Sequence, residues 1–248
     1  MAQVNSQIRS KPKITWGWVI LSVIVTLSLL CVFWTPKTEG MTTPQSVSAH
    51  ARTRRTSALA QIEELLRTHP HPDVRGEFYE MVRRGDFILN PLENYGGDAG
   101  FIPMDAQTLH QSGYKPKGAL TPVMHVWTVI LQPEYKARAQ LVLYHEFVHY
   151  QQWRDGQWWE GDLSLASQEE SDVAHKNACM KKWYAEVEVY HKMCVLGRTT
   201  GLTDALGSDE PLATICGAKE DAFQSTLHEI LMPDGASAGI CSDVWSTL

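Results

Sequence analysis

Residues 141–150 read Leu-Val-Leu-Tyr-His-Glu-Phe-Val-His-Tyr, an apolar run with two histidines and a glutamate inside it. In a helix, residues four positions apart lie on one face, so His145 and His149 point the same way and Glu146 lies beside them. The apolar neighbours predict a mostly buried segment, in which imidazole and carboxylate groups need hydrogen-bond partners or a metal ion. The run therefore requires a fold in which a buried helix, expected over residues 135–154, meets polar groups from another segment.

The spacing H-E-x-x-H is that of a zinc site with a built-in base. We expect His145 and His149 to be zinc ligands and Glu146 to be the general base. The alternative is a structural helix whose histidines only form hydrogen bonds. A catalytic zinc ion has three protein ligands and a water molecule in the fourth position, so a third ligand must come from elsewhere in the chain.

Two glutamates of a long helix, expected over residues 168–197, are candidates for the third ligand. Glu188 lies four residues before Lys192, which predicts an exposed ion pair on the helix surface. Glu186 instead shares its face with residues three, four and seven positions away that form a mostly apolar stripe, and this face should point inward. The stripe consists of Cys179, Trp183, Tyr190 and Met193. We therefore prefer Glu186 and keep Glu188 as an alternative.

This pattern resembles the gluzincin class of zinc metallopeptidases, in which H-E-x-x-H is followed on a later helix by a glutamate ligand. The resemblance covers about residues 140–195. It implies a zincin-like fold, Zn²⁺ held by His145, His149 and Glu186, and hydrolysis of peptide bonds with Glu146 as the catalytic acid and base.

One position departs from the gluzincin pattern. Many gluzincins carry an acidic residue four positions after the ligand glutamate, where this chain has Tyr190. The tyrosine hydroxyl is expected to accept an imidazole N–H or to stabilise the oxyanion of the reaction, so Tyr190 is a candidate catalytic residue. His191 is a second candidate for the oxyanion donor.

The same run also resembles the extended zinc motif of the metzincins, whose third ligand lies six residues after the second histidine. That position is Asp155 in this chain, which makes Asp155 a further alternative ligand. The metzincin motif needs glycine where this chain has Gln152, because the backbone must leave the helix there. The gluzincin pattern is therefore the better match.

Residues 14–34 form a run of 21 residues without a charge. As a helix the run would be about 32 Å long, enough to cross a bilayer once. The alternative is a cleaved signal peptide, but Val32-Phe33-Trp34 has no small-residue cleavage pattern. Tryptophans near the ends of the run occupy positions typical of interfacial residues: Trp16, Trp18 and Trp34. We therefore expect a single transmembrane anchor.

Basic residues close to the run predict its orientation. Three precede it, at positions 9, 11 and 13, and only Lys37 follows it closely, so residues 1–13 are expected to be cytoplasmic. The C-terminal domain would then be periplasmic or extracellular. After residues 1–13, 19 basic side chains face 28 acidic ones, a balance of −9 that excludes nucleic acid as the expected partner.

Four cysteines lie beyond the predicted anchor, an even number in a compartment expected to be oxidising. Cys179 and Cys194 should share one helix about 22 Å apart, which is too far for a disulfide bond. Two pairings remain open, 179 with 241 and 194 with 216, or 179 with 216 and 194 with 241. We prefer the first because an antiparallel hairpin produces nested bridges, and four free buried thiols are the alternative.

Residues 35–58 are rich in Thr, Ser, Pro and Arg and are predicted to form a stalk between the membrane and the domain. Residues 59–248 are predicted to form one zincin-like metallopeptidase domain of the α+β class, mainly helical. Within residues 56–84, two helices are expected, over 56–66 and 73–84. Residues 123–131, rich in β-branched and aromatic side chains, are the best predicted strand.

That strand is expected to lie at the edge of a small antiparallel sheet, close to the helix over residues 135–154. An extended peptide substrate can add a strand to such an edge. The expected function is a membrane-anchored zinc peptidase that acts on a protein or peptide. The alternative is a non-catalytic binding or assembly protein, tethered to the membrane, whose H-E-x-x-H site is structural or vestigial.

Overall fold

The computed structural model describes residues 44–94, 97–116, 118–157, 168–208, 210–234 and 241–248. The chain divides into two compact units, residues 1–49 and residues 50–248. In the first unit the described residues, 44–49, are helical. Within the described ranges no helix is long and apolar enough to cross a bilayer. The predicted anchor over residues 14–34 and the cytoplasmic segment before it lie outside those ranges.

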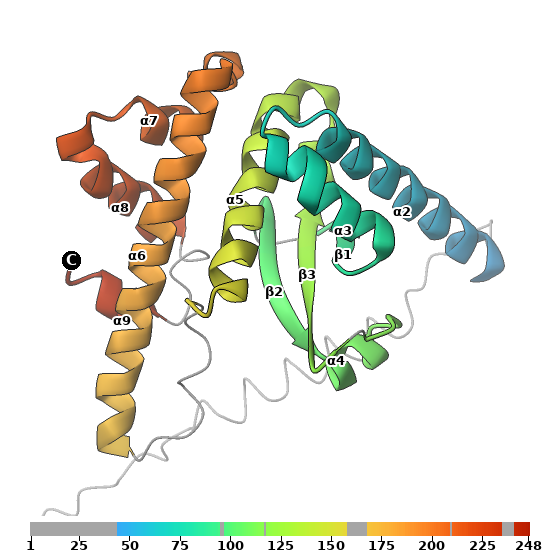
Figure 1. Cartoon of the computed structure of the whole chain (residues 1–248), viewed down its shortest axis with the longest axis horizontal. Coiled ribbons are helices and arrows are strands. Elements are labelled where there is room, and N and C mark those ends of the chain that lie inside the picture. Colours follow the sequence, from blue (N-terminus) through green and yellow to red (C-terminus); the bar gives the residue numbers. More distant parts are fainter. Residues whose placement is uncertain (1–43, 95–96, 117, 158–167, 209, 235–240) are drawn as a thin grey trace, which may run out of the picture. The chain divides into compact units, whose positions relative to one another are not determined.

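The second unit combines many helices with one small sheet, so the expected mainly helical α+β class is correct (Figure 1). The sheet has three strands in the order β1-β3-β2. Strands β1 (Ile88–Leu92) and β3 (Leu120–Trp127) are parallel, whereas β2 (Ala99–Asp105) runs antiparallel to β3. The expectation of a purely antiparallel sheet was therefore wrong, and the sheet is mixed.

The position of the predicted strand was also wrong in two respects. β3 is the central strand, flanked on both sides, and the edge strands are β1 and β2. The strand ends at Trp127, and residues 128–131 form a 3₁₀ helix, η2 (Thr128–Leu131), in which Ile130 and Leu131 are buried. A short apolar run does not by itself distinguish a strand from a buried turn, which explains the overlong prediction.

The two helices that carry the site follow the predicted segments closely. The motif helix α5 (Lys136–Arg154) ends before Gly156, which adopts a positive φ of 75°. The long helix α6 (Gln168–Thr200) packs against α5. The first helix, α2 (Pro44–Arg67), starts well before the expected residue 56 and includes much of the segment predicted to be a stalk.

Shorter helical segments complete the unit. The predicted helix over 73–84 is a π-helical segment, η1 (Val74–Phe78), followed by α3 (Tyr79–Arg84). The rest are α4 (Ala106–Gln111), η3 (Pro133–Tyr135), η5 (Thr203–Ala205), α7 (Pro211–Gly217), η6 (Glu220–Ala222), α8 (Phe223–Asp234) and α9 (Ser242–Trp245).

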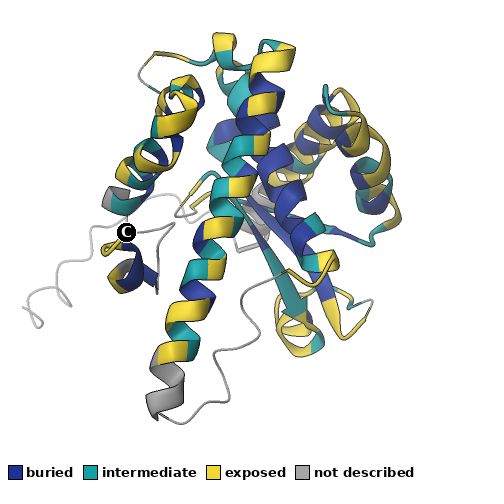
Figure 2. Cartoon of the chain, turned by 60° about the vertical axis from the view of Figure 1, so that its left-hand side comes forward, coloured by how far each residue is buried: buried dark blue, intermediate teal, exposed yellow. Residues whose placement is uncertain are grey.

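An aromatic cluster joins α5 to the sheet and to η1. The Phe78 ring stacks on Phe147 at 5.1 Å and meets Phe87 edge-on at 4.7 Å between ring centroids. Tyr150 of α5 meets Phe87 edge-on at 5.4 Å, and Phe101 of β2 lies 6.1 Å from Tyr150. Figure 2 shows exposed residues on the outward side of the helices, while the inner elements are largely buried. This core fixes α5 against the strand that lies beside the motif.

Two disulfide bonds hold the C-terminal helices to α6. Cys179 pairs with Cys241, and Cys194 pairs with Cys216. The preferred nested pairing is therefore correct. A second aromatic contact, between Trp183 and Trp245 at 5.3 Å, lies beside the first bond.

Gly197 marks a close approach between α6 and its neighbours. A Cβ atom there would lie 2.6 Å from Cγ2 of Thr203 and 3.3 Å from Cδ2 of Leu141 in α5. Glycine in a helix interior costs about 1 kcal/mol relative to alanine. At position 197 this cost accompanies the close packing of α6 against Thr203 and Leu141, which a larger residue would prevent.

Arg138 of α5 connects the sheet to the C-terminal helices. Its guanidinium donates to both carboxylate oxygens of Asp98, at 2.7 and 2.9 Å, and to Oε2 of Glu210 at 2.7 Å. Asp98 directly precedes β2, and Glu210 directly precedes α7. The interaction therefore fixes the start of β2 against α5.

His69, after α2, is fully buried and uses both ring nitrogens. Its Nε2 donates to the carbonyl oxygen of Gln140 at 2.8 Å, and its Nδ1 accepts the backbone N–H of His71 at 3.0 Å. This arrangement requires a neutral ring, because a protonated Nδ1 has no lone pair to accept with. Burial lowers the pKa of His69 from its usual 6.5 to about 4.

We expect His69 to make the free energy of unfolding depend on pH. Above pH 6.5 the imidazole is neutral in both states and its contribution is fully present. Between pH 6.5 and 4 only the unfolded chain takes up the proton, so the contribution falls by up to about 3 kcal/mol. Urea unfolding of chelator-treated protein from pH 4 to 7.5 should show a shallower loss for His69→Gln than for the wild type. Parallel curves for the two proteins would contradict this assignment.

Candidate metal centre

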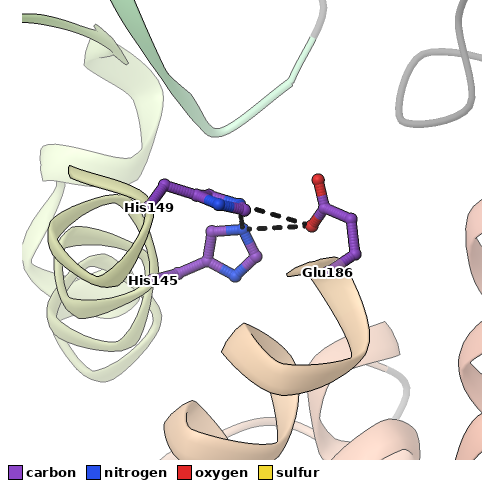
Figure 3. A group of neighbouring side chains, drawn as sticks. All are labelled: His145, His149 and Glu186. Carbon is purple, nitrogen blue, oxygen red and sulfur yellow. Dashed lines mark hydrogen bonds and ion pairs between the residues drawn. The ribbon is translucent and has the colours of Figure 1, made fainter. Parts of the chain in front are cut away.

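The two motif histidines lie one turn apart on α5 and face the same point (Figure 3). Their Nε2 atoms are 3.1 Å apart, and the rings meet edge-on with centroids separated by 4.7 Å. Both side chains are buried. The predicted placement of His145 and His149 on a single buried helix face is thus found in the structure.

Glu186 reaches this point from α6. Its Oε2 lies 3.5 Å from Nε2 of His145 and 3.4 Å from Nε2 of His149 (Figure 3). The apolar stripe around it packs inward as expected, with Cys179, Trp183 and Met193 buried. Helix packing between α5 and α6 therefore brings a carboxylate to the two imidazoles from a position 37 residues beyond His149 in the sequence.

The spacing of these three atoms fits a tetrahedral zinc ion. Zinc–ligand bonds of about 2.0–2.1 Å place neighbouring ligand atoms of a tetrahedron about 3.3 Å apart. The three separations here are 3.1, 3.4 and 3.5 Å. Among the described residues, His145, His149 and Glu186 are the one group of three ligand-bearing side chains close enough to share a metal ion. Two imidazoles and one carboxylate form a donor set typical of catalytic zinc.

Glu146 lies beside this group and makes a different contact. Its Oε2 accepts the backbone N–H of Phe101 in β2 at 2.6 Å, and its Oε1 lies 3.9 Å from Nε2 of His145. The side chain is buried. Glu146 is thus held at the edge of the sheet, next to the three candidate ligands.

Burial and mutual charge separate the pKa values of these groups. Burial, together with the charge of His149, lowers the pKa of His145 to about 3. Burial also disfavours charge on His149, but the charge of Glu186 and its hydrogen bond outweigh that effect and raise the His149 pKa to about 9. Despite burial, the charge of His149 and its hydrogen bond lower the pKa of Glu186. His149 and Glu186 therefore form a buried ion pair.

The pKa of Glu146 moves the opposite way from that of Glu186. Burial, together with the nearby charge of Glu186, raises the pKa of Glu146 to about 7 despite the favourable charge of His149. Two buried carboxylates in one centre thus differ in proton affinity. A difference of this kind is what separates a ligand from a proton-transferring group.

Sequence reasoning assigned no site role to Gln152. Its Oε1 lies 3.0 Å from Nδ1 of His149. Its Nε2 donates to Oε2 of Glu188 at 3.1 Å and to the carbonyl oxygen of Ala185 at 3.4 Å. Its position three residues after His149, on the same helical face, is the sequence signal that was available.

The alternative ligands lie outside the group. Glu188 is exposed and pairs with Lys192 at 2.6 Å, as its spacing predicted. Asp155 is exposed at the end of α5 and accepts a hydrogen bond from Arg154 at 3.0 Å. Among the three carboxylates considered, Glu186 is the one that reaches both histidines.

The two candidate oxyanion donors take different positions. Tyr190 is half-buried, and its ring meets His145 edge-on at 4.7 Å between centroids. His191 instead lies 3.5 Å from Glu220 and packs edge-on against Phe223. Tyr190 therefore adjoins the three candidate ligands, whereas His191 contacts η6 and α8.

The strand beside the centre is β2, at the edge of the sheet. The carbonyl oxygen of Asp98 accepts the N–H of Trp127 at 2.8 Å. Backbone N–H and C=O groups alternate in direction along a strand, so those of Gly100 and Ile102 also face β3. Those of Ala99, Phe101 and Pro103 face away from the sheet. The bond from Phe101 N–H to Glu146 agrees with this alternation. Pro103, which has no N–H, also falls at an outward position, as is typical of edge strands. The edge predicted for residues 123–131 is therefore provided by Ala99–Asp105.

Comparison of the chain with protein-family models, with curated proteins and with solved structures finds no match.

Proposed function

We propose that this chain is a zinc-dependent peptidase of gluzincin-like architecture. The observation that carries the proposal is the convergence of three ligand atoms, at separations of 3.1 to 3.5 Å, beside a buried glutamate. Two histidines from one helix, a glutamate from a later helix and a base adjoining the first histidine make up the gluzincin arrangement. A zincin-like fold follows as part of the proposal.

A bound zinc ion would polarise the scissile carbonyl and lower the pKa of a water molecule towards 7. Glu146 is suited to accept the proton of that water, because burial raises its pKa to about 7, near the value that favours general base catalysis. Glu146 then donates the proton to the leaving amine. Tyr190, whose ring adjoins His145, is the proposed donor to the oxyanion.

The edge of β2 supports an extended peptide as substrate. The backbone N–H and carbonyl oxygen of Ala99 and the carbonyl oxygen of Pro103 face outward, at positions where an added strand could form hydrogen bonds. The N–H of Phe101 already holds Glu146, so a peptide along this edge would run past the proposed base. We therefore propose a protein or peptide as the substrate.

The proposed location is a membrane surface outside the cytoplasm. The uncharged run over residues 14–34 and the basic residues before it support a single anchor with a cytoplasmic N-terminus. The two disulfide bonds support an oxidising compartment for residues 50–248. The proposed protein is thus a single-pass membrane peptidase with its domain in the periplasm or the extracellular space.

The role of Glu146 is tested with Glu146→Gln in the full chain purified in detergent. We expect the variant to keep about one zinc per chain, because Glu146 is not a ligand, and to cleave peptides about 10²–10⁴-fold more slowly. Zinc content is measured by elemental analysis, and cleavage is measured on a mixed peptide library. Glu134→Gln, at an exposed position, is the matched control and should behave as the wild type.

Three results would argue against the peptidase. Wild-type protein without zinc after reconstitution would remove the metal centre. Zinc binding without cleavage of any peptide would favour the non-catalytic binding or assembly protein. Full cleavage by Glu146→Gln would remove Glu146 as the base.

The third ligand is tested by comparing two glutamates of α6. Glu186→Ala should lower zinc affinity by several orders of magnitude, because it removes a donor atom at the metal position. Glu188→Ala removes an exposed carboxylate and should have a much smaller effect. Competition with a chromophoric chelator measures both affinities, and equal losses would contradict the assignment of Glu186.

A further inference from the structure

We propose that Gln152 is the positioning residue of this centre, which fixes the imidazole of His149 and ties it to the helix that carries the third ligand. The inference rests on the proposed zinc site and adds to it a residue that is not a ligand. Gln152 is buried, lies three residues after His149 and contacts both helices of the site.

The contacts of Gln152 fix the direction of its amide. Its Nε2 faces a carboxylate oxygen of Glu188 and the carbonyl oxygen of Ala185, and both of these groups accept hydrogen bonds. If the amide were turned by 180°, Oε1 of Gln152 would face the oxygen atoms of Ala185 and Glu188, and no hydrogen bond would form. The remaining atom, Oε1, therefore faces His149, where it acts as an acceptor.

This direction determines the tautomer of His149. Because Oε1 accepts only, the contact at 3.0 Å requires a proton on Nδ1 of the imidazole. Nδ1 is thereby occupied, and Nε2 is the ring atom that faces His145 and Glu186. A metal-binding histidine depends on this kind of partner for its ring orientation and tautomer.

Gln152 also holds the segment of α6 around Glu186. Its two acceptors, Ala185 and Glu188, flank the proposed ligand on either side. Lys192 in turn binds Glu188 at 2.6 Å from the solvent side. One side chain thus orients a ligand of α5 and anchors the backbone that carries a ligand of α6.

A neutral amide suits a centre that already contains two buried carboxylates, Glu146 and Glu186. A carboxylate at this position would accept the same N–H more strongly but would add a third negative charge. The amide orients His149 without that charge. It also donates to Glu188, which a carboxylate does not do.

The test measures zinc affinity of the full chain in detergent for three variants. Gln152→Leu keeps similar volume but removes the acceptor, and we expect zinc affinity to fall about 10–100-fold. The double variant Gln152→Glu with Glu188→Gln exchanges carboxylate and amide, so the acceptor for His149 and the bond to α6 both return at unchanged net charge. We expect this variant to recover part of the affinity, because the acceptor for His149 returns while a third carboxylate then lies in the centre. Gln151→Leu, at the preceding position of α5, is the matched control and should match the wild type.

Two further readouts separate positioning from packing. Thermal unfolding of the metal-free proteins reports any loss of stability, and the visible spectrum of the Co²⁺-loaded proteins reports the ligand geometry. We expect Gln152→Leu to have a changed cobalt spectrum, and the double variant to restore the wild-type one.

The outcomes distinguish this inference from the proposed function. Wild-type zinc binding with unchanged affinity in Gln152→Leu would overturn the role of Gln152 and leave the zinc site standing. A double variant as weak as Gln152→Leu would also overturn it, because the acceptor alone would not matter. Failure of the wild type to bind zinc would remove the site and this inference together.

Discussion

The packing of α6 against α5 is the interaction on which the candidate site depends. It places the carboxylate of Glu186, whose side chain is 13% exposed, within 3.5 Å of two buried imidazoles. A buried charge without a partner is strongly unfavourable, so buried charged groups in proteins are usually paired. In the metal-free protein the pair of His149 and Glu186 meets that need, and the same atoms fit a tetrahedral cation.

Several parts of the fold keep the two helices at this distance. Gly197 lets α6 approach Leu141 closely, and the bond between Cys194 and Cys216 holds the same end of α6 to α7. Arg138 connects α5 to the start of β2 through Asp98. The aromatic cluster around Phe147 fixes the other side of α5. The site is therefore built on elements that are supported from both sides, as a centre with defined geometry requires.

Local sequence patterns were enough to predict both helices and the inward face of Glu186, whereas for the disulfide bonds they left two pairings open, of which the preferred one is present. Helical periodicity contains that information, because residues three and four apart share a face. The place of β3 in the sheet depends on pairing with β1 and β2 from distant parts of the chain, and an alternating pattern does not record it. Gln152 was missed for a related reason. Its role depends on Ala185 and Glu188 of another helix, whose approach no local pattern specifies.

Two glutamates in one buried centre have different environments, and this difference gives each its chemistry. Glu186 faces two imidazoles, and the charge and hydrogen bond of His149 lower its pKa, so it stays ionised as a ligand should. Glu146 has one backbone N–H as its hydrogen-bond partner at Phe101, and burial raises its pKa toward neutrality. This contrast supports the proposed roles, Glu186 as a ligand and Glu146 as the base. The edge strand β2 therefore holds the proposed base through the N–H of Phe101, beside the backbone positions proposed for a peptide.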